Sequence, residues 1–262
     1  MGRLTISFIT LCFMLVQLSI AEIDPDTIVG AWLFDEIDGK VAADSSDNGN
    51  DGNLVGGAKW VEGKFGNAIE LNGTDAWVTV PAIAPLKEFT LLKWFNLTGR
   101  VGAWRCFFNH DGWARGFVHY QFRPDNKMEF GIHSNNPARH PGYADSDFTA
   151  DQSILNRWYH LAVAYSSIEE SVRVYFDGEL DAGGKWEGAL PGEFGPGRIG
   201  SWSNGGREWQ GMFDEMLLFN VSLEEKDIQM LMKNGLEEAL AVEAADKAAI
   251  IWGKIKVGYT EN

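Results

Sequence analysis

Residues 158–178 read WYHLAVAYSSIEESVRVYFDG, and this stretch decides the fold class. Apolar side chains occupy every second position over 159–165 and again over 172–176, which is the spacing of a half-buried strand. The polar residues 166–170 separate the two runs, and Asp177-Gly178 follows the second run as a further turn signal. The stretch therefore predicts a β-hairpin.

The same alternation recurs outward along the chain, over 77–80 and 89–97, and a further strand is predicted over 213–219. The 11 Trp and 30 Gly suit short aromatic strands joined by tight turns. No internal repeat or low-complexity linker divides the chain. The sequence therefore predicts an all-β domain built as an antiparallel sandwich.

Several phrases occur in a fixed order over this region: Asp44-Ser45-Ser46, Gly66-Asn67-Ala68-Ile69-Glu70-Leu71-Asn72-Gly73, Trp158-Tyr159-His160-Leu161-Ala162-Val163, Val174-Tyr175-Phe176-Asp177-Gly178 and Gly211-Met212-Phe213-Asp214-Glu215. Together they resemble the laminin G-like members of the concanavalin A-like lectin and glucanase family. The resemblance implies a concanavalin A-like jelly-roll sandwich of two antiparallel sheets, from about Ile28 to Ser222. It also implies a domain that binds glycans or proteins.

The first residues have the pattern of an export signal. An apolar run from Leu4 to Ile20 follows Arg3 and ends in Ser19-Ile20-Ala21, which predicts a signal peptide over 1–21. The run is short for a membrane span, and an uncleaved N-terminal anchor is the alternative. We expect a secreted, periplasmic or cell-surface protein whose mature chain does not insert into a membrane.

The remaining chain divides into the jelly-roll domain, 22–222, and a C-terminal extension, 223–262. A short helix is predicted from about Leu223 to Asn234, because Gly235 is a typical helix stop. Beyond it, Ile250, Ile251 and Trp252 lie close to the C-terminus. This tail is a docked helix, a partner-binding segment or a loose end, and docking is expected because it would cover the apolar side chains.

The formal net charge of −15 argues against nucleic acid and anionic membranes as partners. It favours calcium, neutral sugars or basic proteins. Of the two cysteines, Cys12 lies in the predicted signal peptide and only Cys106 remains, so the mature chain contains no internal disulfide.

A glycine-rich loop over 44–53 concentrates the oxygen ligands that calcium prefers. It matches only the first half of a helix-loop-helix calcium loop, because Val55 occupies the position of the closing Glu. The family resemblance implies a different completion, in which an acidic residue of the last strand closes the site. The predicted structural calcium ligands are Asp44, Ser46, Asn48, Asn53 and Asp214, and the alternative is a cluster of Asx turns that bonds only its own backbone.

Catalytic patterns are incomplete. Glu36-Ile37-Asp38-Gly39-Lys40 begins a glucanase-type phrase but has Lys40 where the second Glu belongs. Asp214 and Glu215 are adjacent and are expected to point to opposite faces of a strand. The five histidines form no zinc motif. We therefore expect no enzymatic activity, with an unrecognised glycan-active hydrolase as the third hypothesis.

Carbohydrate binding is the leading functional prediction, because sugars stack on aromatic rings and bond planar polar side chains. Aromatic and polar residues mix without strand alternation over 104–143 and again over 186–209. The predicted ligand-binding residues are Trp104, His110, Trp113, Arg139, Tyr143, Trp202 and Trp209. For any single Trp, core packing is the alternative, and a protein-binding adhesion or matrix role is the alternative function.

Lys93 departs from the family pattern. Strand alternation places it on the same face as Phe89, Leu91 and Phe95, so its charge would be buried. We expect either a local register slip or a carboxylate partner.

Overall fold

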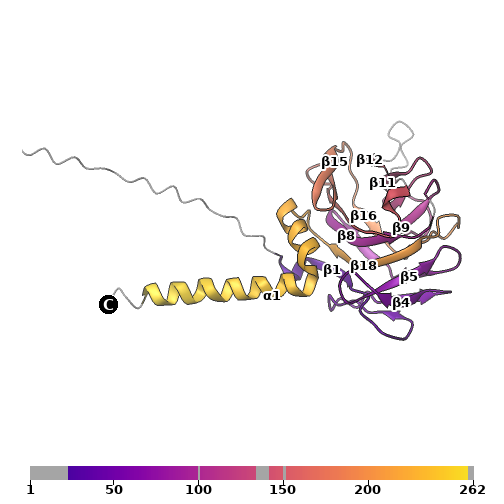
Figure 1. Cartoon of the computed structure of the whole chain (residues 1–262). Coiled ribbons are helices and arrows are strands. Elements are labelled where there is room, and N and C mark those ends of the chain that lie inside the picture. The colour runs from indigo at the N-terminus through magenta and orange to yellow at the C-terminus, as the bar shows by residue number, and fades with distance from the viewer. Residues whose placement is uncertain (1–22, 100, 134–141, 150–151, 259–262) are drawn as a thin grey trace, which may run out of the picture.

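The computed structural model describes residues 23–99, 101–133, 142–149 and 152–258; for 142–149, 152 and 242–258 it describes only the backbone. Two large antiparallel sheets face each other in this structure (Figure 1). This is the predicted concanavalin A-like jelly-roll sandwich, and the expected fold class is confirmed.

Sheet A has the order β15 (Glu179–Lys185), β14 (Ser171–Phe176), β13 (Trp158–Ser166), β8 (Glu88–Leu97), β18 (Gln210–Phe219), β5 (Asn67–Asn72), β4 (Lys59–Glu62), and β1 (Ile28–Trp32) also pairs with β18. Sheet B has the order β12 (Gly142–Thr149), β11 (Lys127–Ile132), β10 (Val118–Phe122), β9 (Arg105–His110), β17 (Gly197–Ile199), β6 (Trp77–Val80), β3 (Gly52–Val55), β2 (Val41–Ala42). The remaining elements are the paired strands β7 (Ile83–Leu86) and β16 (Gly192–Phe194), two 3-10 turns (Pro25–Thr27 and Gln152–Ile154) and helix α1 (Glu225–Gly258).

The predicted hairpin is β13 and β14, which pair from Leu161 opposite Phe176 to Ser166 opposite Ser171. The strands expected over 77–80, 89–97 and 213–219 are β6, β8 and β18. These predictions are confirmed. Buried and half-buried residues alternate in β6, whereas nearly every residue of β8 and β18 is buried, because a second apolar cluster covers their outer face.

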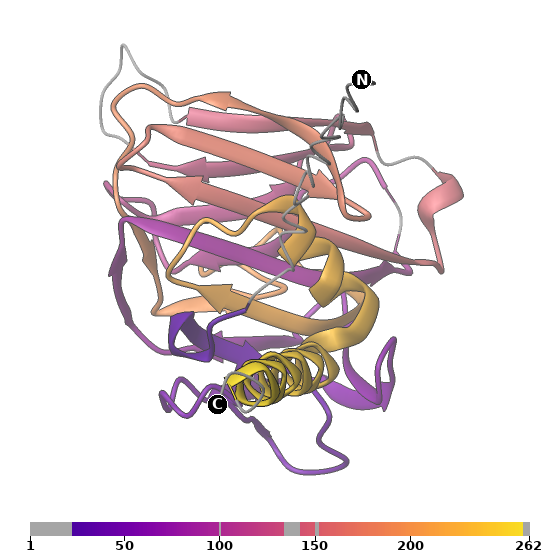
Figure 2. The same cartoon turned by 90° about the vertical axis from the view of Figure 1, so that its left-hand side faces the viewer.

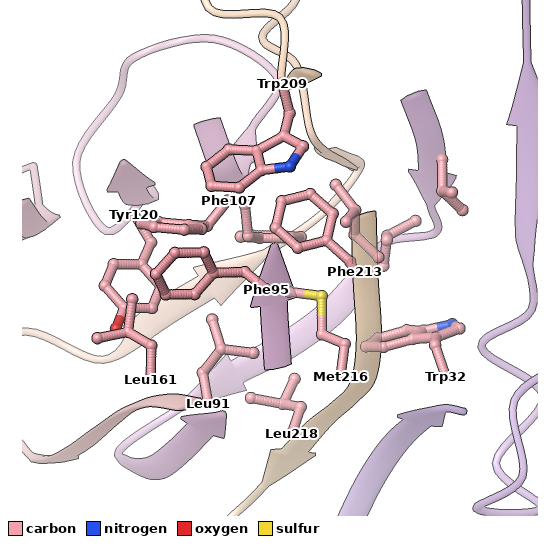
Figure 3. Packing of buried hydrophobic residues seen from close by; sticks show 14 of the residues in the cluster. Trp32, Leu91, Phe95, Phe107, Tyr120, Leu161, Trp209, Phe213, Met216 and Leu218 are labelled. Atoms are coloured by element: carbon pink, nitrogen blue, oxygen red, sulfur yellow. The ribbon is translucent and has the colours of Figure 1, made fainter. Parts of the chain in front are cut away.

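Apolar side chains of both sheets fill the space between them (Figure 3). Trp209 is fully buried there, with its ring centroid 4.6 Å from that of Phe213, 4.9 Å from Phe107 and 5.7 Å from Phe95. Edge-to-face and tilted arrangements of this kind stabilise aromatic cores beyond the area that they bury.

Lys93 also points into this core and is fully buried. The expected carboxylate partner is not found among the described residues. The expected register slip occurs on one side only, in the pairing with β18 between Asp214 and Leu217, and it leaves Lys93 facing the core. Nζ lies 3.8 Å from the ring centroid of Tyr120 and 4.3 Å from that of Phe107. Burial pulls the pKa of Lys93 well below its ordinary value, so the amine tends to lose its charge inside the sandwich.

A second apolar cluster covers the outer face of sheet A. The first segment of α1 lies across this face (Figure 2), and its Ile228 and Leu231 join Leu92, Ala162 and Leu217 of the sheet. The predicted helix is confirmed in place, and its apolar side chains pack on the sandwich.

The helix is longer than predicted. Gly235, with φ 72° and ψ 173°, breaks the helical geometry, after which the chain is helical again as far as Gly258. This second segment leaves the sandwich (Figure 1), so the expected docking of the tail is wrong beyond the buried Leu236 and Ala239. A glycine in the left-handed region allows the change of direction. No described helix is long and apolar enough to cross a membrane.

Candidate functional site

The outer face of sheet B carries a row of buried polar side chains. In β10, Tyr120 points into the core, and the alternation of the strand sends His119 and Gln121 to the opposite face. Asn109 of β9 pairs with His119, and Glu129 of β11 pairs with Gln121. All four polar side chains are buried.

Three tryptophans, one arginine and two of these polar residues form what we call the Arg207 cluster: Trp104, Trp113, His119, Gln121, Trp202 and Arg207. The Arg207 guanidinium lies 4.0 Å from the ring centroid of Trp202 and 4.8 Å from that of Trp104. Its Nη1 donates to Oε1 of Gln121 and lies 3.3 Å from Nδ1 of His119. The arginine is thus held between two rings and two polar acceptors.

Hydrogen bonds fix the polar side chains behind the cluster. Nε2 of Gln121 donates to Oε1 of Glu129 at 2.8 Å, and Nδ2 of Asn109 donates to Oε1 of Gln121 at 3.2 Å. Oδ1 of Asn109 accepts the backbone N–H of Tyr120 at 3.1 Å. A connected network of this kind holds its members in one arrangement.

The rim of the cluster is aromatic and partly open to solvent. Trp113 is 38% exposed, and its ring centroid lies 4.2 Å from that of His119 and 4.5 Å from that of His133. Nε1 of the half-buried Trp202 donates to the carbonyl of Gly112 at 3.4 Å. Burial lowers the pKa of His119 to about 3, and the Arg207 charge adds to this effect, so His119 is neutral at pH 7.

Three of the predicted ligand-binding residues come together here: Trp104, Trp113 and Trp202. His110 is 5% exposed and its ring stacks on that of Phe117 at 3.4 Å, so it supports the surface from below and does not face solvent. Arg139 lies outside the described residues, and Tyr143 belongs to β12 but its side chain lies outside the description.

Trp209 is not a ligand-binding residue, which corrects the prediction. It is fully buried in the core, and its N–H donates to the carbonyl of Gly200 at 2.8 Å just before β18 begins. The sequence around it lacks strand alternation, so nothing local distinguishes an inward Trp from an outward one.

His119 and Gln121 were not among the predicted ligand-binding residues. Their signal was present in the run Val118-His119-Tyr120-Gln121-Phe122, where polar residues occupy alternate positions between apolar ones. Such a strand has one apolar and one polar face.

The predicted calcium ligands do not form one site. Both carboxylate oxygens of Asp44 accept backbone N–H groups, from Ala31 at 2.8 Å, Ser46 at 3.0 Å and Asn50 at 2.9 Å. Nδ2 of Asn48 donates to the carbonyl of Ile28 at 2.8 Å, and Oγ of Ser46 donates to that of Val29 at 3.3 Å. Asn53 is an exposed residue of β3. The loop therefore matches the alternative, an Asx-turn cluster, and also ties the chain to β1.

Asp214 points elsewhere. Its Oδ2 accepts the backbone N–H groups of Lys64 at 2.7 Å and Phe65 at 2.9 Å, while Oδ1 is buried and has no partner among the described residues. Within the described ranges, no three His, Cys, Asp or Glu side chains lie close enough together to hold a metal ion.

The expectation that Asp214 and Glu215 point to opposite faces is wrong. Strand β18 contains a bulge between Asp214 and Leu217, and Glu215 has φ 48°. A bulge lets neighbouring side chains share one face. Oε2 of Glu215 accepts the N–H of Leu236 at 3.0 Å, at the break in α1. Burial raises the pKa of each carboxyl to about 7, and the Asp214 charge adds to the effect on Glu215.

A family model described as the concanavalin A-like lectin/glucanases superfamily matches residues 72–229. No curated protein matches the chain in sequence. Among solved structures, the chain is similar to domain 4 of AbnA, a GH43 extracellular arabinanase from Geobacillus stearothermophilus, in complex with arabinotriose. The TM-score is 0.59 at 18% identity, over 79% of this chain and 98% of that domain.

Two toxin structures are also similar. The binding domain of botulinum neurotoxin serotype D matches with a TM-score of 0.63 at 12% identity, over 80% of this chain and 52% of that chain. Botulinum neurotoxin type C, whose cell entry depends on interaction with two ganglioside molecules, matches with a TM-score of 0.61 at 14% identity, over 80% and 51%. The chain thus spans about half of each toxin chain. At these identities the likeness establishes the fold alone.

Proposed function

The chain belongs to the concanavalin A-like lectin/glucanases superfamily, and on that premise we propose that it is a non-catalytic carbohydrate-binding module whose ligand site is the Arg207 cluster. The observation that carries this proposal is the partly exposed Trp113, which contacts His119, next to an arginine that lies against Trp202 and Trp104 and is fixed by Gln121 and His119. Aromatic rings beside fixed polar groups are what a sugar requires, since it has apolar faces and an edge of hydroxyls.

Two features of the similar structures support the proposal by analogy. The arabinanase domain is bound to arabinotriose, and the neurotoxin relies on gangliosides, so related sandwiches bind carbohydrate. Fold likeness does not decide function, and the Arg207 cluster is therefore the stronger argument.

A binding role without catalysis agrees with the chemistry of the cluster. Glu129 accepts a hydrogen bond from Gln121 and lies 3.7 Å from the Arg123 guanidinium, so its carboxylate is engaged by protein groups behind the cluster. Glycoside hydrolysis needs a protonated carboxyl facing a second carboxylate across the scissile bond. Asp214 and Glu215 have raised pKa values, but backbone N–H groups on the outer face of sheet A occupy both of them.

The first test is binding of the purified chain to a broad glycan array. We expect binding to a defined sugar class, and we expect Trp113→Ala and Trp202→Ala each to weaken it at least tenfold, or about 1.4 kcal/mol, because each removes a stacking surface. Ile168→Ala is the matched control, an exposed apolar side chain in the β13–β14 turn. A blank array together with a specific protein partner would contradict the proposal and support an adhesion module.

We also propose export of the chain, on the basis of the signal pattern over 1–21. An exported, acidic, carbohydrate-binding module would meet its partner, a glycan or an extracellular protein, outside the cell. Recovery of the chain without residues 1–21 from the medium or cell envelope, established by N-terminal sequencing, is the corresponding measurement.

A structural calcium ion is a separate proposal, now restricted to Asp214. Its buried Oδ1 lacks a described partner and is a hard oxygen donor of the kind that calcium binds. Because the described residues place no cluster of three acidic side chains there, the other ligands would be backbone carbonyls and water. Calcium would then hold the Lys64–Phe65 turn against β18 and would perform no chemistry.

Calcium in excess is expected to raise the melting temperature by about 5–10 °C over EGTA at roughly 100-fold saturation, and Asp214→Asn should abolish the difference. Asp44→Asn serves as the matched comparison, because the Asp44 carboxylate is already saturated by backbone N–H groups. Superimposable melts of the wild-type chain would contradict a calcium site. If Asp44→Asn, and not Asp214→Asn, abolishes the calcium-dependent rise in melting temperature, the calcium site is in the 44–53 loop.

A further inference from the structure

A groove lies on the outer face of sheet A, beside the first segment of α1. On β8, Leu92 is covered by the helix, and Trp94 lies two residues further along the same face. Trp94 lines a groove of about 610 Å³ between the Lys64–Phe65 turn, the β14–β15 turn and α1, and it is 7% exposed because Lys64 and Phe65 lie against its ring. Figure 2 shows how the first segment of α1 crosses this face.

The lining combines aromatic surface with charges of both signs. The Phe65 and Trp94 rings meet edge to face with centroids 6.2 Å apart, and Met232 of α1 adds a thioether. Two lysines, Lys64 and Lys233, and two acids, Asp177 and Glu179, line the same space. Because the charges cancel, a ligand with a large net charge is disfavoured.

The walls of the groove are held in place. Asp177 is fixed to β13, since its Oδ1 accepts the His160 N–H at 2.8 Å and its own N–H donates to the His160 carbonyl at 2.8 Å. Nε2 of Gln229 in α1 donates to the Gly178 carbonyl at 3.0 Å, which fastens the helix to the β14–β15 turn. A Cβ at Gly178 would lie 3.0 Å from the Met232 methyl carbon, so the two walls meet closely.

Lys64 is the movable part of the groove. Its N–H is bound to Asp214, which fixes the backbone, while the exposed side chain places Nζ 4.4 Å from the Trp94 ring centroid. A flexible lysine over a tryptophan ring is readily displaced, because its ammonium can move into water.

Buried polar atoms without hydrogen-bond partners lie on the Trp94 ring and on the neighbouring His160 ring. Nε1 of Trp94 and both ring nitrogens of His160 are buried, and none has a hydrogen-bond partner in the described part of the chain. The two rings lie 5.3 Å apart. Burial lowers the pKa of His160 to about 3, so the ring is neutral at pH 7. Buried polar groups without partners are rare in native proteins, and three around one ring mark this place as unusual.

We propose that this groove is a second carbohydrate site, which binds a neutral, hydroxyl-rich sugar on Trp94 after Lys64 swings away. Hydroxyl groups both donate and accept, so they satisfy Asp177 and Glu179 as well as Lys233 and Gln229. The inference rests on the proposed function only for the class of ligand.

The two sites lie on opposite sheets, since the Arg207 cluster is on the outer face of sheet B and the groove is on that of sheet A. One chain could then hold two glycan strands at once. Such bivalency raises apparent affinity for a polymer without any added contact.

The test is isothermal titration of the full chain with soluble cellohexaose, xylohexaose and linear arabinohexaose. We expect two sugar molecules per chain for the sugar that binds, and one in Trp202→Ala. The double variant Glu179→Ala/Lys233→Ala, confined to exposed side chains, should remove the other site or weaken it at least tenfold. Lys185→Ala is the matched control, an exposed lysine at the far end of β15.

The outcomes separate the two sites. One bound sugar that is lost in Trp202→Ala and kept in the double variant would overturn the groove and leave the proposed function intact. One bound sugar that is lost in the double variant and kept in Trp202→Ala would support the groove and overturn the Arg207 cluster. No binding of any of the three sugars would overturn the proposal for the groove. Lys64→Met gives a second readout, because it should alter affinity only at the groove.

Discussion

Trp209→Ala is expected to lower the free energy of unfolding by about 3–5 kcal/mol, the range for removing a large buried aromatic side chain. Trp209 is fully buried and contacts the rings of Phe107, Phe213 and Phe95 from both sheets. Its removal would leave a cavity between the two sheets that their rigid backbones cannot close. Urea denaturation followed by far-ultraviolet circular dichroism measures the change.

Trp113→Ala is the matched control, since this tryptophan is 38% exposed on the outer face of sheet B. Its effect on stability should stay within about 0.5 kcal/mol, while its effect on sugar binding should be large. A loss of less than about 1 kcal/mol in Trp209→Ala, accompanied by loss of sugar binding, would contradict the core position of Trp209 and restore its predicted role in the ligand site.

Lys93→Met is expected to raise the free energy of unfolding at pH 7 by about 1–4 kcal/mol, as for other replacements of buried charged groups by apolar ones of similar volume. Lys93 is fully buried between the Phe107 and Tyr120 rings, and its Nζ lacks a hydrogen-bond partner among the described residues. Methionine keeps the length of the side chain and removes the amine.

The pH dependence distinguishes this cause from simple repacking. The unfolded chain binds a proton at Lys93 up to its ordinary pKa of about 10.4, whereas burial pulls the folded pKa well below that value. Protonation therefore favours the unfolded state, and the wild-type chain gains stability as pH rises between the two pKa values. The advantage of Lys93→Met should shrink by about 1.4 kcal/mol per pH unit within this window.

Urea denaturation of both chains between pH 7 and pH 10, the range just below the ordinary pKa of lysine, measures this difference, and groups that do not interact with Lys93, such as His119, cancel in it. Leu91→Met, on the same face of β8 and equally buried, controls for the introduction of methionine. Stability curves that run parallel over this range would contradict a lowered pKa for Lys93. A lower stability of Lys93→Met at pH 7 would show that the contacts of the amine with the two rings outweigh its burial.

The sandwich could be predicted because its signals are local. The larger apolar side chains at alternate positions of 159–165 and 172–176 face the core between the sheets, so their period of two is readable without knowledge of any partner. The first segment of α1 was predictable for the same reason, since Ile228 and Leu231 fall on one helical face before Gly235.

The candidate site was only partly predictable. Trp104, Trp113 and Trp202 were named because tryptophan beside polar residues in loops is a local signal, but the same signal selected Trp209, which is in the core. Whether an irregular segment sends a tryptophan inward depends on the strand that receives it, and that strand is distant in the sequence.

The sequence by itself determined the fold class, the hairpin of β13 and β14 and the burial of Lys93, because strand alternation fixes which face each residue occupies. Only the tertiary structure decided what surrounds them. It joined Arg207 to Gln121 across the sheet, and placed Asp214 and Glu215 on one face through a bulge. Such arrangements depend on contacts between residues far apart in the chain and on backbone irregularities, and neither leaves a periodic trace in the sequence.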